Sequence, residues 1–187
     1  MKFTAVVSMF VLGLAITCDG GEPLASARSA KPAARANPQI DFPGFVSLSR
    51  DVQAIRKTRL VPIDKFNQMA KDKKTIILDT RSKAAFDKIH VKGAIHLNFS
   101  DFTADKLAKV IPSKNTCILI YCNNNFVAQR VPEIAMKGAR LALNIPTFVN
   151  LHGYGYENVY ELADALQLDD KRVHLAGTRF DQTLTLK

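Results

Sequence analysis

The sequence predicts an α/β fold in which a parallel sheet of about five strands carries helices on both faces. Two continuous apolar runs, 75–79 and 117–121, have the character of strands that are buried on both sides. Segments with helical character lie between these runs and the weaker strand candidates, and such alternation is typical of a parallel sheet. A length of 187 residues accommodates one domain of this kind.

The first 27 residues have the features of a signal peptide. Lys2 supplies a positive charge, and residues 5–16 form an apolar run that is too short to span a bilayer. Residues 25–27, Ala-Ser-Ala, fit a small-x-small cleavage site, whereas Cys18 offers a competing site at which the chain would carry a lipid anchor. We therefore expect an exported protein of the periplasm or cell envelope that has no membrane-spanning segment.

Residues 28–44 are expected to form a flexible tether. This segment is rich in Ala, Pro, Ser, Lys and Arg and has few large apolar residues. It also contains Pro32, Pro38 and Pro43, which interrupt helices. A single folded domain is then expected from residue 45 to residue 187.

Shorter elements complete the alternating pattern. Further strands are expected at 60–61, 94–97 and 158–162. Helices are expected at 64–71, 82–88, 103–110 and 132–144, with Ser82 as a cap and Pro132 at an early helical position. Binding sites in parallel sheets lie where strands end, and the two clearest strands end at Asp79 and Tyr121.

The charge and the histidines exclude several classes of site. A formal net charge of +9 favours anionic partners. Because the basic residues are spread along the chain without an accompanying series of aromatic residues, we do not expect nucleic-acid binding. The four histidines lack the paired spacing and the neighbouring thiols of a zinc site. We predict no metal and no cofactor.

Two cysteines belong to the predicted domain, and their spacing predicts free thiols. Cys117 and Cys122 lie on one strand and its end, and a rise of about 3.3 Å per residue separates their Cα atoms beyond the reach of a disulfide. Cys117 is expected to be a small buried hydrophobic residue. No CxxC pair is present, which excludes a thioredoxin-like dithiol, and Ala128 stands where a cysteine phosphatase needs Arg.

The thiol of Cys122 is the candidate for chemistry. It stands at the carboxyl end of a predicted central strand, where a loop and the following helix can direct backbone N–H groups and a positive helix end at the sulfur. That arrangement stabilises a thiolate, which makes the residue nucleophilic. The alternative is that Cys122 only ends a buried strand. The loop residues expected to shape the site are Asn123, Asn124, Asn125, Phe126 and Val127.

Four segments of the chain resemble the rhodanese family. Residues 78–82, Leu-Asp-Thr-Arg-Ser, with Phe86 after them, are similar to its strand and Asp-x-Arg motif, and residues 90–95, His-Val-Lys-Gly-Ala-Ile, are similar to its His-Ile-Pro-Gly-Ala motif. Residues 118–122 resemble the strand that leads to the active cysteine, and residues 155–162 resemble the strand after the long helix. The segments occur in the order of the family.

The resemblance implies a rhodanese-like fold and a sulfurtransferase or persulfide carrier. Cys122 would take sulfane sulfur from a small sulfur-containing anion, become a persulfide, and pass the sulfur to a thiol or to cyanide. Asp79 and Arg81 would support the loop near the site. The alternative for these two residues is a surface ion pair.

Differences from the family pattern leave two further functions open. The loop after Cys122 lacks the Gly and the Arg or Lys that are common in the family, and the stretch to Asn158 is longer. We expect Arg130, Lys137 and Arg140 to be plain solvated residues. One alternative is therefore a rhodanese-like module that binds a partner or a small anion without turnover. The other is a redox-sensing thiol.

Overall fold

The computed structural model describes residues 37–127 and 134–180. The chain divides into two units, residues 1–38 and 39–187, and almost all of the described residues belong to the second. The expected signal peptide with Cys18, residues 28–36 of the expected tether, and Arg130 lie outside the described residues. Within the described ranges, no helix is both long enough and apolar enough to cross a bilayer.

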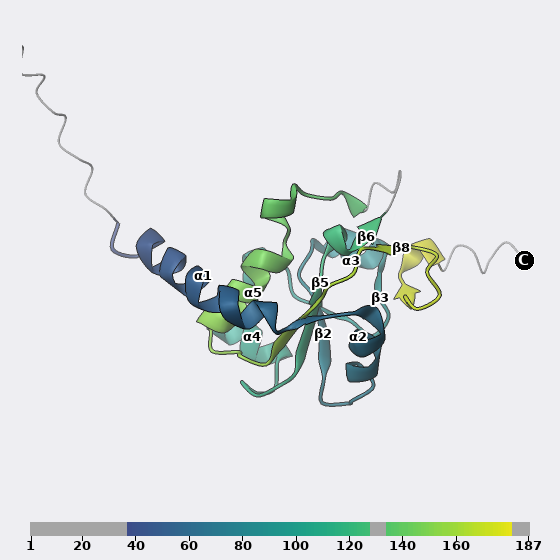
Figure 1. Ribbon diagram of the computed structural model, residues 1–187, viewed down its shortest axis with the longest axis horizontal. Coiled ribbons are helices and arrows are strands. Elements are labelled where there is room, and N and C mark those ends of the chain that lie inside the picture. The colour runs from purple at the N-terminus through teal and green to yellow at the C-terminus, as the bar shows by residue number, and fades with distance from the viewer. Residues whose placement is uncertain (1–36, 128–133, 181–187) are drawn as a thin grey trace, which may run out of the picture. The chain divides into compact units, whose positions relative to one another are not determined.

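Five parallel strands form the central sheet (Figure 1). Their order is β1-β7-β5-β2-β4, so β5 lies in the middle with β2 and β7 as neighbours. The register places Leu119 of β5 opposite Ile77 of β2 and Tyr160 of β7. The predicted five-stranded parallel sheet is therefore confirmed. Its strands are β1 (Leu60–Val61), β2 (Ile76–Asp79), β4 (Ile95–His96), β5 (Ile118–Tyr121) and β7 (Val159–Leu162).

Alternate residues of the strands enter two separate hydrophobic cores, because successive side chains of a strand point to opposite faces. Ile118 and Ile120 belong to one core, whereas Leu119 and Tyr121 belong to the other. The first core contains residues of α1, α4 and α5, and the second contains residues of α2. The helices are α1 (Phe42–Lys57), α2 (Ile63–Met69), α4 (Ala104–Val110) and α5 (Asn144–Gly153).

Helix α1 begins inside the segment that the sequence assigned to the tether. It starts at Phe42, and the Asp41 side chain caps it by accepting a hydrogen bond of 2.8 Å from the Gly44 N–H. Pro43 lies in the first turn, where its missing N–H has no partner within the helix to lose. Residues 42–44 are therefore helical, and the expected end of the tether at residue 44 is corrected.

Two other helices begin at residues whose side chains cap them. Ser82 accepts a hydrogen bond from the Ala85 N–H at the start of α3 (Lys83–Lys88), which confirms the predicted cap. Thr103 accepts one from the Lys106 N–H at the start of α4. Smaller elements surround the sheet: η1 (Phe99–Asp101), η2 (Asn123–Asn125), η4 (Ala139–Leu141), β3 (His90–Val91) paired with β9 (Leu175–Ala176), and β6 (Phe126–Val127) paired with β8 (Leu166–Gln167).

The prediction of a helix at 132–144 is wrong for the part of this range that the structure describes. Residues 134–143 contain no α-helix: residue 134 is in 3-10 conformation, η4 is a short 3-10 helix, and the α-helix begins at Asn144 instead. Gly138 disfavours a helix interior, and Pro146 is tolerated because it falls in the first turn of α5. Pro146 therefore lies at the start of a described helix, whereas Pro132 lies outside the described residues.

Substitution of Leu119 tests whether β5 is buried at the centre of the sheet. Its side chain is fully buried, so Leu119→Ala removes apolar contacts and leaves a cavity in the second core. We expect the free energy of unfolding to fall by about 3 kcal/mol, measured by urea denaturation. Leu141→Ala, at a position that is 70% exposed, is the matched control and should change little. Equal effects of the two substitutions would contradict the described packing.

Candidate active site at Cys122

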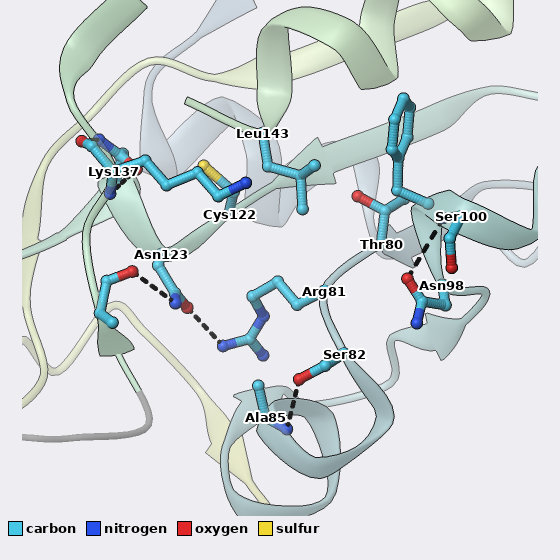
Figure 2. Close-up of a pocket in the computed structure, with 13 residues that line it drawn as sticks. Thr80, Arg81, Ser82, Ala85, Asn98, Ser100, Cys122, Asn123, Lys137 and Leu143 are labelled. Carbon is cyan, nitrogen blue, oxygen red and sulfur yellow. Dashed lines mark hydrogen bonds between the residues drawn. The ribbon is translucent and has the colours of Figure 1, made fainter. Parts of the chain in front are cut away.

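A cavity of about 380 Å³ lies beside the carboxyl ends of β2, β4 and β5. Its walls come largely from the segments that follow these three strands, which lie next to one another in the sheet (Figure 2). Parallel strands bring their carboxyl ends to one edge of the sheet, which is why residues far apart in the chain meet here. The lining residues are Thr80, Arg81, Ser82, Ala85, Asn98, Phe99, Ser100, Cys122, Asn123, Asn124, Ala135, Lys137 and Leu143.

Cys122 contributes the one thiol among the residues that line this cavity. It follows β5 directly, and only 1% of the residue is exposed. The backbone N–H groups of Asn124, Leu143 and Asn144 act on its sulfur as donors that lower the pKa of the thiol. Two of these donors belong to the first residue of α5 and the residue before it, so the positive end of that helix is directed at the thiol.

The balance of these effects differs from the expected stabilised thiolate. Burial raises the pKa of the Cys122 thiol, and the three backbone N–H groups only partly offset this, so that the pKa lies above its ordinary value. The helix was expected to follow the loop after Cys122 directly. Along the chain, however, η2, β6 and the segment 134–143 come between Cys122 and α5. The thiol is therefore mainly protonated at neutral pH.

The side chain of Asn125 holds the loop after Cys122 in place. Its Oδ1 atom accepts hydrogen bonds of 2.9 Å from the Cys122 N–H and from Asn144 Nδ2. Its Nδ2 group donates to the carbonyl oxygens of Leu162 and Asp164, at the end of β7. Asn125 is itself buried, so it positions the cysteine backbone and takes no part in the cavity wall.

Asp79 and Arg81 form a buried ion pair that braces the same loop. Arg81 Nη2 lies 2.6 Å from Asp79 Oδ2, and the two residues are 5% and 0% exposed. Arg81 Nη1 donates a hydrogen bond of 2.8 Å to Asn123 Oδ1. Burial opposes the positive charge, but the hydrogen bonds and the charge of Asp79 outweigh it and raise the pKa of Arg81. The interpretation as a surface ion pair is therefore wrong.

Asn123 and Asn124 attach the segment 134–143 to the site. Asn123 Nδ2 donates to the carbonyl oxygen of Ala135 at 3.0 Å, and Asn124 Nδ2 donates to that of Lys137 at 2.7 Å. The Lys137 N–H donates in return to Asn124 Oδ1. These bonds use backbone groups that a helix over this segment would need, and they place Lys137 on the cavity wall, where its side chain extends toward Cys122 (Figure 2).

The structure separates the predicted site residues into three groups. Cys122, Asn123, Asn124 and Arg81 line the cavity. Asp79 and Asn125 lie behind it, where they hold the residues that line it. Phe126 and Val127 form β6, and Phe126 is buried in the second core, so the structure does not bring these two to the cavity.

Several lining residues were not found from the sequence. Asn98, Phe99 and Ser100 follow β4, and their place after a predicted strand end is a signal that points to them. Lys137 was expected to be solvated, and no sequence signal places it here, because its position depends on the amide contacts of Asn124. Within the described ranges, no group of three or more His, Cys, Asp and Glu residues is arranged to hold a metal ion.

Cys117 lies at the other end of β5. Both Cys117 and Cys122 are free thiols, as their spacing predicts. Cys117 packs against the second core but is only partly buried and lines a different cavity, so the expectation of a small buried hydrophobic residue is met only in part. The reason is that it precedes β5 rather than lying within it.

Comparison with known proteins adds a family to this geometry. The sequence model of the family described as "Rhodanese-like domain" matches residues 63–167. No curated protein matches the chain. Among solved structures, the chain is similar to a rhodanese from E. coli with anions, at 21% identity over 55% of this chain and 98% of that chain, with a TM-score of 0.37. It is also similar to a Bacillus halodurans protein, at 19% identity over 68% of this chain and 83% of that chain, with a TM-score of 0.43. The rhodanese-like domain of an Anabaena protein is similar at 18% identity over 66% of this chain and 83% of that chain, with a TM-score of 0.44.

Arg81 tests the brace under the loop. Arg81→Met removes the charge while it keeps much of the side-chain length, and it leaves Asp79 buried without its ionic partner. We expect the free energy of unfolding to fall by about 3 kcal/mol in urea denaturation at neutral pH. The matched control is Arg172→Met, since Arg172 pairs with Asp170 on the surface and should leave stability almost unchanged. A similar small effect of both changes would contradict a buried brace.

Proposed function

The chain belongs to the rhodanese-like domain family, and from this membership we propose that it is a sulfurtransferase or persulfide carrier that moves sulfane sulfur through Cys122. The observation that carries the proposal is the position of the thiol. The sulfur lies beside a cavity at the end of the central strand, where three backbone N–H groups act as donors that lower the pKa of the thiol. These donors would stabilise negative charge on the sulfur when the thiol loses its proton.

The proposed cycle has two half-reactions. The thiol proton leaves to solvent, and the Cys122 thiolate attacks the outer sulfur of a donor such as thiosulfate. A bond forms between Sγ and that sulfur, the sulfur–sulfur bond of the donor breaks, and its electron pair leaves with sulfite. An acceptor thiolate or cyanide then attacks the terminal sulfur of the persulfide, and the electron pair of the broken bond returns to Cys122.

Charge and size at the cavity support a small anionic donor. Lys137 and Arg81 line the cavity with positive charge, and the amide groups of Asn98, Asn123 and Asn124 lie around it. A volume of about 380 Å³ accommodates a small sulfur oxyanion together with the end of an acceptor. Because the guanidinium of Arg81 is held by Asp79 and Asn123, Lys137 is the more available cation for such a donor.

We also place the proposed activity outside the cytoplasm. The support is the signal-peptide pattern of residues 1–27, which end in a small-x-small site. The intact mass of the exported protein tests this, because the loss of residues 1–27 is expected. A mature protein that retains them would contradict export by this route.

Cys122→Ser tests the sulfur-carrying role. After exposure to thiosulfate or a polysulfide, intact mass spectrometry should show the unchanged protein gaining one sulfur atom that a reductant removes, whereas Cys122→Ser should gain none. Cys117→Ser is the matched control, since this thiol lies at the opposite end of β5, and it should still gain the sulfur. Loading that persists in Cys122→Ser, or is lost in Cys117→Ser, would contradict the proposal.

A second candidate is a module that binds a small anion or a partner without turnover. The raised pKa of Cys122 favours it, because a protonated thiol is a poor nucleophile. The same mass measurement separates the two functions. If neither the unchanged protein nor the variants gain sulfur while isothermal titration detects thiosulfate binding, the binding module replaces the sulfurtransferase.

The rate of sulfur loading should rise with pH. Burial raises the pKa of the Cys122 thiol above its ordinary value, and only the thiolate attacks, so the reactive fraction is small at neutral pH. Below that pKa, the loading rate should increase about tenfold for each pH unit. This dependence is measured by quenching the loading reaction at set times, at several pH values from neutral to alkaline, and recording the intact mass. A rate that is flat from neutral pH upward would mean a thiol with a lowered pKa.

A further inference from the structure

Helix α1 lies outside the matched residues 63–167, yet one of its side chains reaches the sheet beside Cys122. Arg56 Nε and Nη2 donate hydrogen bonds of 2.6 Å to the two carboxylate oxygens of Glu161 in β7. Glu161 is 5% exposed, and Arg56 is half-buried above it. A two-point contact of this kind fixes the orientation of the carboxylate as well as its charge.

The carboxylate of Glu161 is linked to the cysteine through two amide side chains. Glu161 Oε1 accepts a hydrogen bond from Asn144 Nδ2 at 3.2 Å. The same Nδ2 group donates to Asn125 Oδ1 at 2.9 Å, and that oxygen also accepts from the Cys122 N–H. A continuous chain of hydrogen bonds therefore leads from α1 to the backbone of Cys122.

The position of Asn144 shows what this chain of bonds does. Both hydrogen bonds of its Nδ2 group are directed at Asn125 and Glu161, while its Oδ1 atom is buried without a partner among the described residues. The side chain of Asn144 is thus held by Asn125 and Glu161, which accept from its Nδ2 group, and its Oδ1 atom does not contribute. Its backbone N–H is one of the three donors to the Cys122 sulfur, so the bonds that hold Asn144 also aim this donor.

Three charged side chains from separate parts of the chain lie near the thiol or act on it. Arg81, after β2, and Lys137, in the segment 134–143, line the cavity with positive charge. Glu161 belongs to β7. Burial is the largest cause that raises the pKa of the Cys122 thiol, and the negative charge of Glu161 raises it further. Arg56 is the cation that directly pairs with this carboxylate.

We propose that Arg56 is a positioning residue for Cys122, which acts by holding and neutralising Glu161 behind the amides of Asn144 and Asn125. Helix α1 is then part of the reactive site and more than a support for the tether. The role rests on the proposed function, in which Cys122 is the reacting group. It has a readout of its own, because ionisation of the thiol is measured without any sulfur donor.

Arg56→Gln tests the proposal through the pH dependence of Cys122 alkylation by iodoacetamide, followed for each cysteine by peptide mass spectrometry. Removing the guanidinium leaves the negative charge of Glu161 unpaired, which disfavours the thiolate. The midpoint of the rate profile should move up by about 0.5 pH unit, which lowers the rate about threefold on the acidic side. Arg56→Lys, which keeps the charge, should restore most of the profile.

Three controls separate this role from a general effect on folding. Arg50→Gln, at an exposed position of the same helix, should leave the profile unchanged. Glu161→Gln alone should move the midpoint down, and it tests the charge effect even if Arg56→Gln does not fold. Adding Arg56→Gln to Glu161→Gln should cause no upward shift. An unchanged profile in both single variants, or the same upward shift in both backgrounds, would overturn the proposal, and neither result depends on whether sulfur transfer occurs.

Discussion

The site depends on how the polar groups at the end of a fully buried strand find partners. All four residues of β5 are buried, and the chain beyond Tyr121 stays buried at Cys122. Backbone N–H and C=O groups in such a place must be hydrogen-bonded. The amide of Asn125 meets this need for the Cys122 N–H and for the carbonyl oxygens at the end of β7. The side chain of Asn125 thus joins the loop after β5 to the end of β7. These hydrogen bonds fix the backbone of Cys122 and with it the position of the thiol.

The surroundings of the thiol result from opposing effects of burial and of hydrogen bonding. Burial disfavours the charged sulfur, whereas the N–H groups of Asn124, Leu143 and Asn144 favour it. Two of these donors come from the start of α5, some twenty residues along the chain from Cys122. Asn123 and Asn124 donate hydrogen bonds to carbonyl oxygens of the segment 134–143, which leads into α5. The same asparagines that shape the loop therefore bring Lys137 to the cavity wall.

Helix α1 extends the folded domain beyond the residues of the family match. It contributes Val52 to the first core, where Phe148 and Leu151 of α5 also lie, and its Arg56 pairs with Glu161 of β7. The family match begins only after this helix. Helix α1 thus shares a core with α5 and pairs with a buried carboxylate of the central sheet, although the family match does not include it. Sequence reasoning assigned its first turn to a tether because Pro43 breaks a helix interior, whereas a first turn accepts proline.

The sequence by itself determined the five strands of the central sheet, their parallel direction and the thiol at the end of a central strand. Apolar runs such as 118–121 and the cap at Ser82 are local signals, and they depend on few residues close together in the chain. Only the tertiary structure decided what surrounds Cys122. The charge of Glu161 and the N–H of Asn144 act on the thiol because contacts form between residues far apart in the chain. No local pattern encodes such contacts, because they exist only once the sheet has aligned its strand ends and the helices have packed against it.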